Sequence, residues 1–199
     1  MPNKVILKET IREIKIGNQI WNLKNLNLEN FQNGDSIPQA KTSEQWINYN
    51  KEGKPAWCYY DFNPEKGKRL GKLYNWYVIN DPRNIAPKGW HIPNNEEWKE
   101  LINFLGGQKI ASSKLKNTFG WDGTDGNNES GFTGLPGGRI DRNGDFSFIN
   151  LIGEWWSIPE KDSEFGYYFN LGTEYGDGRI NLESVTKDYG FSIRCIKNF

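Results

Sequence analysis

The sequence predicts an α+β protein in which a few helices precede many short antiparallel strands. Helix signals fall between residues 42 and 118, whereas most strand-like runs follow residue 150. The chain contains 22 Gly, nine Trp, nine Tyr and 11 Phe but only one Met. This composition is typical of a loop-rich domain whose volume is filled by aromatic rings, and it does not suit a helical bundle.

The first part of the chain predicts a hairpin and a short helix. Gly17-Asn18 stands between two strand-like segments and is typical of a tight turn. Residues 1–15 are expected to be an N-terminal extension or a first strand. Thr42-Ser43-Glu44-Gln45 resembles a capping box, so a helix should begin there and end before Gly53. The next segments are expected to form a strand, a turn and a second strand: 55–62, 63–68 and 70–79.

A central helix has the clearest signals. Asn94 can accept a hydrogen bond from an otherwise unpaired backbone N–H, and Glu97 stands three residues later, as in a capping box. Gly106-Gly107 is expected to end the helix in the left-handed conformation. The apolar side chains between these signals follow helical spacing and should form one buried face: Trp98, Leu101, Ile102 and Leu105.

A long structured loop region is expected after the central helix. Residues 110–118 can form a short helix or an irregular segment, and Gly, Asn and Asp dominate from Phe119 onwards. Asn143-Gly144 predicts a hairpin turn inside this region. Strands are then expected over the following ranges: 153–158, 167–171, 178–182 and 190–196.

Charge and hydropathy exclude several classes of partner. The chain has 25 basic and 25 acidic residues, so its formal net charge is zero. Nucleic acids and anionic membranes usually attract a basic excess, so neither is expected as a partner. No apolar run reaches the roughly 18 residues of a membrane-spanning helix. The N-terminal residues lack the long apolar run of a secretory signal.

Two cysteines and one histidine limit the metal and nucleophile chemistry. Neither Cys58 nor Cys195 has a second Cys or a His at metal-ligand spacing, so a zinc site is not expected. Two buried reduced thiols and one disulfide both remain open. His91 could be a general base or a metal ligand, but the interpretation as a packed, hydrogen-bonded residue is favoured. No nucleophile motif of the G-x-S-x-G type occurs.

The segment Asp141 to Asp145 resembles the start of a calcium loop but departs from its spacing. Gly144 falls at the fourth position instead of the sixth, and Ile152 occupies the twelfth position, where a Glu is required. A hairpin turn is therefore favoured, and no cofactor is predicted. Calcium could still be held by ligands gathered from distant loops, around Asp122, Asp125, Asn127, Asn128 and Glu129.

Trp155-Trp156 allows two interpretations. Neighbouring side chains on a strand face opposite sides, so one ring should enter the core while the other could be exposed. An exposed ring would form a flat aromatic and polar surface suited to sugar stacking or protein contact. In the second interpretation, both rings belong to the core.

A series of motifs resembles one protein family. Together they look like the Fibrobacter succinogenes major paralogous domain family, over about Ile16 to Cys195. The motifs occur in this order: Gly71-Lys72-Leu73-Tyr74-Asn75-Trp76-Tyr77, Asn80-Asp81-Pro82-Arg83, Ala86-Pro87-Lys88-Gly89-Trp90-His91-Ile92-Pro93, Glu97-Trp98, Asn128-Glu129-Ser130-Gly131-Phe132, Leu135-Pro136-Gly137-Gly138, Trp155-Trp156-Ser157 and Gly190-Phe191-Ser192-Ile193-Arg194-Cys195.

The resemblance implies a single C-type-lectin-like domain over residues 16–199, with two helices, small antiparallel sheets and a long loop region. This fold is shared by sugar-binding lectins, ligand-binding proteins of bacteria and phage, and formylglycine-generating enzymes, so it fixes no activity. The chain lacks the Glu-Pro-Asn, Gln-Pro-Asp and Trp-Asn-Asp triplets of calcium-dependent lectins. It also lacks the paired reactive cysteines of the formylglycine-generating enzymes. Family members are mostly predicted to be secreted or on the cell surface.

We therefore expect a non-enzymatic module that binds a carbohydrate or a protein through the loop region, residues 119–182. One alternative is a structural or interaction domain of a surface assembly, which would expose a contiguous apolar patch. The side chains expected to reach the binding surface are Trp121, Arg139, Trp156, Tyr168, Tyr175 and Arg179. Another alternative is a glycan-acting enzyme in which two carboxyl groups lie about 5–9 Å apart, drawn from Asp122, Glu129, Asp145, Glu154 and Glu160.

Overall fold

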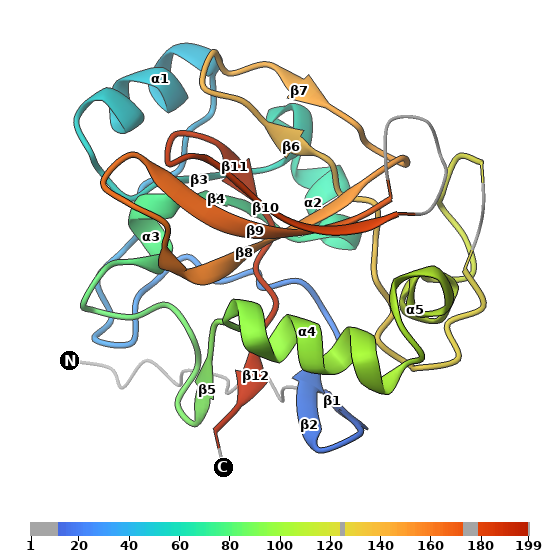
Figure 1. Ribbon diagram of the computed structural model, residues 1–199. Helices are drawn as coiled ribbons and strands as arrows, with labels where there is room; N and C mark the ends of the chain where they lie inside the picture. Colours follow the sequence, from blue (N-terminus) through green and yellow to red (C-terminus); the bar gives the residue numbers. More distant parts are fainter. Residues whose placement is uncertain (1–11, 124–125, 173–178, 199) are drawn as a thin grey trace, which may run out of the picture.

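The computed structural model describes residues 12–123, 126–172 and 179–198. Strands β8, β9 and β10 cross the middle of the molecule in Figure 1, with helix α4 below them and helix α1 above. Strands β1, β2, β5 and β12 lie together at the bottom of the same view. The mixture of helices and antiparallel sheets confirms the predicted α+β class.

The helices of the described residues exceed the two that were expected. They are α1 (Ser43–Lys51), a 3₁₀-helix (Tyr60–Phe62), α2 (Pro64–Leu70), α3 (Trp76–Ile79), α4 (Asn95–Phe104) and α5 (Gln108–Leu115). Residues 64–70 were expected to include a turn, but Asn63 caps a helix by accepting a hydrogen bond from the backbone N–H of Glu65, and Pro64 suits its first position. In the described part of the chain, none of these helices is long and apolar enough to cross a membrane.

Strands form three sheets, and every pair of neighbouring strands is antiparallel. The terminal sheet has the order β1-β2-β12-β5, the five-stranded sheet β3-β4-β11-β6-β7 and the three-stranded sheet β10-β9-β8. The strands are β1 (Glu13–Ile16), β2 (Gln19–Asn22), β3 (Trp57–Cys58), β4 (Leu73–Asn75), β5 (Trp90–His91), β6 (Arg139–Ile140), β7 (Phe146–Ser147), β8 (Gly153–Glu160), β9 (Phe165–Leu171), β10 (Ile180–Thr186), β11 (Gly190–Phe191) and β12 (Ile196–Lys197).

Strand β4 is shorter than the sequence predicted. The expected strand 70–79 pairs only over Leu73–Asn75, and the chain then turns into α3. The Asn75 side chain accepts a hydrogen bond from the Ala56 N–H and donates one to the Lys54 carbonyl, contacts that lie outside a regular strand ladder. The expected strand 55–62 likewise pairs only over Trp57–Cys58 before the 3₁₀-helix begins.

Local turn and capping signals were predicted correctly. Gly17 adopts a φ of 61° in the turn that joins β1 to β2. Asn94 accepts hydrogen bonds from the backbone N–H groups of Glu96 and Glu97, and the Glu97 carboxylate accepts one from the Asn94 N–H, which completes a capping box. The predicted apolar face of α4 is buried.

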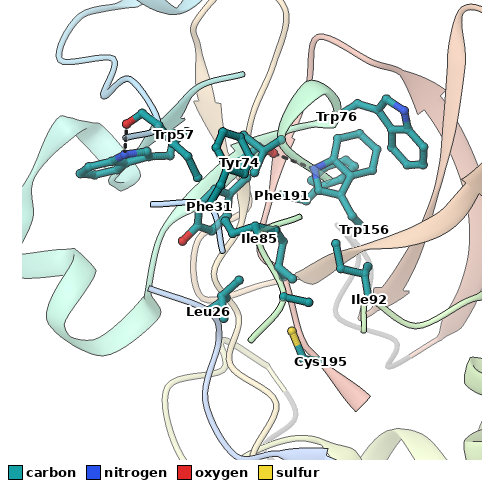
Figure 2. Close-up of a cluster of buried hydrophobic side chains, with 14 of the residues drawn as sticks. Leu26, Phe31, Trp57, Tyr74, Trp76, Ile85, Ile92, Trp156, Phe191 and Cys195 are labelled. Carbon is teal, nitrogen blue, oxygen red and sulfur yellow. Dashed lines mark hydrogen bonds between the residues drawn. The ribbon is translucent and has the colours of Figure 1, made fainter. Parts of the chain in front are cut away.

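The core consists of three clusters of aromatic and aliphatic side chains, and both faces of the three-stranded sheet are covered. Trp155 lies in the cluster that contains Trp98 and Phe169, whose rings stack with centroids 4.1 Å apart. Trp156 lies in a second cluster and donates its indole N–H to the Tyr74 carbonyl, as Figure 2 shows. The two rings therefore face opposite sides of β8, and the interpretation that both belong to the core is confirmed.

A buried arginine ties the C-terminal segment to the loop region. Arg194 is fully buried, and its guanidinium donates to the carbonyls of Asn22 and Phe132 at 2.8 and 2.9 Å. Its charge lies over the Phe132 ring, with 4.3 Å between the guanidinium carbon and the ring centroid. Burial lowers the pKa of Arg194 to about 9. Because strand β2 and the loop region share this one donor, their relative position is fixed.

Candidate functional site

Three of the residues predicted to reach the binding surface are buried, and that part of the prediction is wrong. The relative accessible areas are 6% for Trp121, 0% for Trp156 and 5% for Tyr168. Trp121 packs in the same cluster as Leu171, and Tyr168 packs against the Phe191 ring at 4.7 Å. In a protein with so many tryptophans, these large rings fill the interior between the sheets.

The remaining predicted residues differ in their positions. Arg139 lies on β6 and its side chain is 23% exposed. Arg179 is exposed and directly precedes β10. Tyr175 lies outside the described residues.

Arg139 is the centre of a polar cluster between the five-stranded and three-stranded sheets. It comes from β6, whereas three further polar side chains come from β8, β9 and β10. The register places Tyr168 opposite both Trp156 and Glu183, so these side chains share one face of the three-stranded sheet. We call the following residues the Arg139 cluster: Arg139, Phe148, Glu154, Tyr168, Glu183 and Tyr189.

The Arg139 guanidinium is held by one carboxylate and two aromatic rings. Its Nη1 atom donates to Oε1 of Glu154 at 3.0 Å. The guanidinium carbon lies 4.5 Å from the Phe148 ring centroid and 5.7 Å from that of Tyr189. Phe148 has a φ of 63°, a conformation that a residue with a bulky side chain rarely adopts. The same residue thus has a strained backbone and a ring that contacts Arg139.

Glu154 is a fully buried carboxyl group beside this cation. Burial raises the pKa of Glu154 to about 7, and the nearby Arg139 charge limits the rise. The Glu183 carboxylate also disfavours a second negative charge at this position. Only Oε1 of Glu154 contacts Arg139, while the buried Oε2 atom has no hydrogen-bond partner. Glu154 can therefore change its protonation state near neutral pH.

Tyr168 connects the buried part of the cluster to the surface. Its hydroxyl group donates to Oε2 of the exposed Glu183 at 2.8 Å. Burial, the Glu154 charge and the hydrogen bond to Glu183 all raise the pKa of the Tyr168 hydroxyl, which stays protonated. The outer rim of the cluster thus presents a carboxylate, part of a guanidinium and two half-buried rings.

Sequence reasoning missed Phe148, Glu183 and Tyr189. Phe148 follows a strand of only two residues, and Tyr189 lies in a short connection before β11, so neither has a periodic pattern around it. Glu183 lies one residue beyond the range proposed for the binding region. Alternation along β10 could have identified Glu183, because it shares a sheet face with Asn181 and Val185.

The acidic residues considered for catalysis do not gather in one place. Glu129 pairs with Lys114 at 2.9 Å and Glu160 with Lys187 at 2.6 Å, whereas Glu154 pairs with Arg139. Asp122 and Asp145 are exposed. The carboxylate whose charge acts on Glu154 is Glu183, which comes from outside the predicted set.

Among the described residues, the predicted metal ligands form neither a calcium loop nor a larger acidic group. The Asp141 carboxylate accepts hydrogen bonds from the backbone N–H groups of Asn143 and Asp145, and Gly144 has a φ of 79°, so the predicted hairpin turn is confirmed. Asp125 lies outside the described residues. Within the described ranges, no three His, Cys, Asp or Glu side chains are grouped so that they could hold a metal ion.

His91 is hydrogen-bonded to two side chains, and both cysteines are buried. His91 bonds through Nε2 to Glu97 at 2.7 Å and through Nδ1 to Asn198 at 2.6 Å, which confirms the hydrogen-bonded interpretation. The hydrogen bond with Glu97 raises the pKa of His91, although partial burial opposes the effect. Cys58 and Cys195 are both free and buried, so they do not form the disulfide that the sequence left open.

A shallow groove is lined by residues that do not belong to the Arg139 cluster. It has a volume of ≈ 650 Å³ and runs between α1, α3 and three turns. We call it the α1 groove; its walls include Lys51, Tyr77, Arg142 and Lys187. Lys51 and Arg142 are exposed here, so the groove offers a second polar surface against which the Arg139 cluster can be compared.

The chain was compared with known families, curated proteins and solved structures. The sequence model described as the Fibrobacter succinogenes major domain matches residues 14–197. No curated protein and no solved structure matches the chain.

Proposed function

The chain belongs to the Fibrobacter succinogenes major domain family, and we propose that it is a non-enzymatic module that binds a glycan at the Arg139 cluster. The observation that carries this proposal is the arrangement of Arg139 between two aromatic rings, beside an exposed carboxylate. A protein ligand is the alternative occupant of the same surface.

The groups at the rim suit a ligand rich in hydroxyl groups. A guanidinium has five N–H donors, and Glu154 is the hydrogen-bond acceptor that Arg139 contacts in the described residues. Donors that remain can reach sugar oxygens, while the Glu183 carboxylate can accept from sugar hydroxyl groups. Phe148 and Tyr189 supply apolar surface for the C–H face of a sugar ring. A few polar groups beside aromatic walls are typical of small-molecule sites.

The charges of the cluster favour a neutral ligand when Glu154 is ionised. Arg139 contributes one positive charge, whereas Glu154 and Glu183 contribute one negative charge each. An anion would therefore approach a site with a net negative charge, which is unfavourable. A neutral oligosaccharide meets no such repulsion.

A binding role is supported better than a hydrolytic one. Retaining and inverting glycosidases place two carboxyl groups across a cleft, one of them free to act as base or nucleophile. Glu154 is buried beside Arg139, and Glu183 accepts a hydrogen bond from Tyr168. Both carboxylates are therefore engaged in hydrogen bonds within the protein, which supports a non-enzymatic proposal.

The finer fold assignment is also part of the proposal. We propose a C-type-lectin-like fold, because the terminal sheet joins both ends of the described chain and a long loop region separates α5 from β8.

Large exposed apolar side chains of the described residues are Phe104, Ile110 and Phe119. A few exposed apolar side chains are normal on protein surfaces, so they alone do not favour a purely structural role.

Thermal melting with a panel of neutral oligosaccharides tests the proposal. A ligand that binds only the folded state stabilises it by about 2.7 kcal/mol at a hundredfold excess over its dissociation constant. We expect Arg139→Met to weaken binding at least about tenfold, as for a residue at the centre of a binding site. Glu183→Gln should weaken it too, and its exposed position limits any effect on folding.

Arg142→Met is the matched control. Arg142 is an exposed arginine three residues from Arg139, and it lines the α1 groove instead of the cluster. Loss of binding in Arg142→Met with full binding in Arg139→Met would move the site to the α1 groove. Binding of no oligosaccharide, with unchanged melting, would favour the protein ligand.

A further inference from the structure

Two buried oxygen acceptors without partners belong to neighbouring residues of strands β8 and β9. Oε2 of Glu154 and Oδ1 of Asn170 are both buried and have no hydrogen-bond partner. Glu154 on β8 and Asn170 on β9 are register partners, so their side chains leave the same face of the sheet at neighbouring positions. Leaving two buried acceptors unpaired would cost free energy at each atom.

One proton on Glu154 would supply a partner to both atoms. A protonated carboxyl group is a donor, and an amide oxygen is an acceptor, so Oε2–H of Glu154 can donate to Oδ1 of Asn170. We propose that this buried proton removes the net negative charge of the Arg139 cluster below neutral pH, so that the binding site then accepts acidic glycans such as uronic-acid oligosaccharides. The choice of ligand rests on the proposed glycan-binding function, whereas the proton itself does not.

The charges around Glu154 agree with proton binding. The groups that act on it from the neighbouring elements are Arg139 on β6, Tyr168 on β9 and Glu183 on β10. Burial has the largest effect and opposes ionisation of Glu154, Arg139 favours ionisation, and Glu183 adds to the effect of burial, which places the pKa of Glu154 at about 7. With Glu154 neutral, the charges of Arg139 and Glu183 cancel, and repulsion of an acidic ligand is removed.

An ionised Glu154 offers a different arrangement of the same two side chains. If the Asn170 amide were rotated by 180°, its Nδ2 group could donate to a charged Oε2. Glu154 would then be stabilised as an anion, and its pKa would lie below about 7. The two arrangements therefore predict opposite titration behaviour.

Carbon-13 NMR of the Glu154 carboxyl group distinguishes them, with Glu154→Gln used to assign the signal. We expect a titration midpoint near pH 7, whereas a midpoint near pH 4.5 would overturn the proposal. The glutamine side chain of the Glu154→Gln variant resembles the neutral acid, because its amide oxygen can accept from Arg139 and its NH₂ group can donate to Asn170. The melting temperature of this variant should therefore lack the decrease between pH 5 and pH 7 that Glu154 causes in the wild type.

Binding of a uronic-acid oligosaccharide tests the selection of acidic ligands. The protonated fraction of a group with a pKa of about 7 rises about tenfold from pH 8 to pH 6, so affinity should increase by up to about tenfold in the wild type. Glu154→Gln should bind with the same affinity at both values, and Glu183→Gln should keep the pH dependence. A midpoint near pH 7 without binding of any glycan would reject the glycan-binding function but keep the proton site. A wild-type affinity that does not change with pH would overturn the selection of acidic ligands.

Discussion

Replacement of Arg139 by methionine should destabilise the protein to an extent that depends on pH. At pH 6 most of the Glu154 carboxyl is neutral, and the variant loses one charge-assisted hydrogen bond and the contacts with Phe148 and Tyr189. We expect a loss of about 1–2 kcal/mol in the free energy of unfolding at this pH, given the usual size of such interactions.

Above pH 7 the difference between the variant and the wild type should grow. The pKa of Glu154 is raised in the folded wild type, so the group stabilises folding below its unfolded pKa, and this contribution decreases until pH passes about 7. Without Arg139 the folded pKa rises further, and the decrease continues at about 1.4 kcal/mol per pH unit. At pH 8 the variant should therefore be about 2–3 kcal/mol less stable than the wild type.

Urea unfolding of both proteins at pH 6, 7 and 8 measures this difference. Arg142→Met serves as the control, because its exposed side chain should contribute within about 0.5 kcal/mol at each pH. The double variant Arg139→Met/Glu154→Gln should show a loss that is independent of pH. An Arg139→Met penalty that is the same at pH 6 and pH 8 would refute the coupling between Arg139 and a titrating Glu154.

Three further predictions concern residues outside the Arg139 cluster. Trp98→Ala should lower the free energy of unfolding by about 3–5 kcal/mol in urea titrations, because it removes the stacked partner of Phe169, whereas the exposed Lys99→Ala should have little effect. His91→Gln should destabilise the protein at low pH, because the raised pKa of His91 stabilises the wild type below the unfolded pKa of 6.5. This stabilisation is lost as pH rises through the higher pKa of folded His91. Melting curves at pH 5.5 and pH 8.5 that show an equal effect of the variant would contradict this expectation. Burial raises the pKa of Cys195 to about 12 and that of Cys58 well above its usual range, so a thiol reagent should label neither in the native protein and both after unfolding. Fast labelling of the native protein would show that these thiols are accessible.

Local signals predicted much of the fold. The turn at Gly17, the capping box of α4 and the alternation of Trp155 and Trp156 each depend on a few neighbouring residues. Such features are visible in sequence because local hydrogen bonds, glycine backbone freedom or the alternating geometry of an extended strand determine them. The early ends of β3 and β4 were missed, since partners far along the chain decide where pairing stops, as the Asn75 contacts show.

The candidate site was predicted only in part, for a similar reason. Arg139 and Tyr168 were identified by residue type, but their exposure depends on how two sheets pack. Phe148 and Tyr189 reach Arg139 from separate connections, which no spacing in the sequence indicates. The burial of Trp156 follows from coverage of both sheet faces, a property of the tertiary structure alone.

The most direct test of a glycan site at Arg139 is NMR of arginine side chains during titration with neutral and uronic-acid oligosaccharides. The Nε–Hε signal of Arg139 should shift with ligand concentration, and the ring signals of Tyr189 should shift with the same midpoint. The corresponding signal of Arg142 in the α1 groove should stay in place. Shifts of Arg142 with an unchanged Arg139 would contradict the assignment of the site.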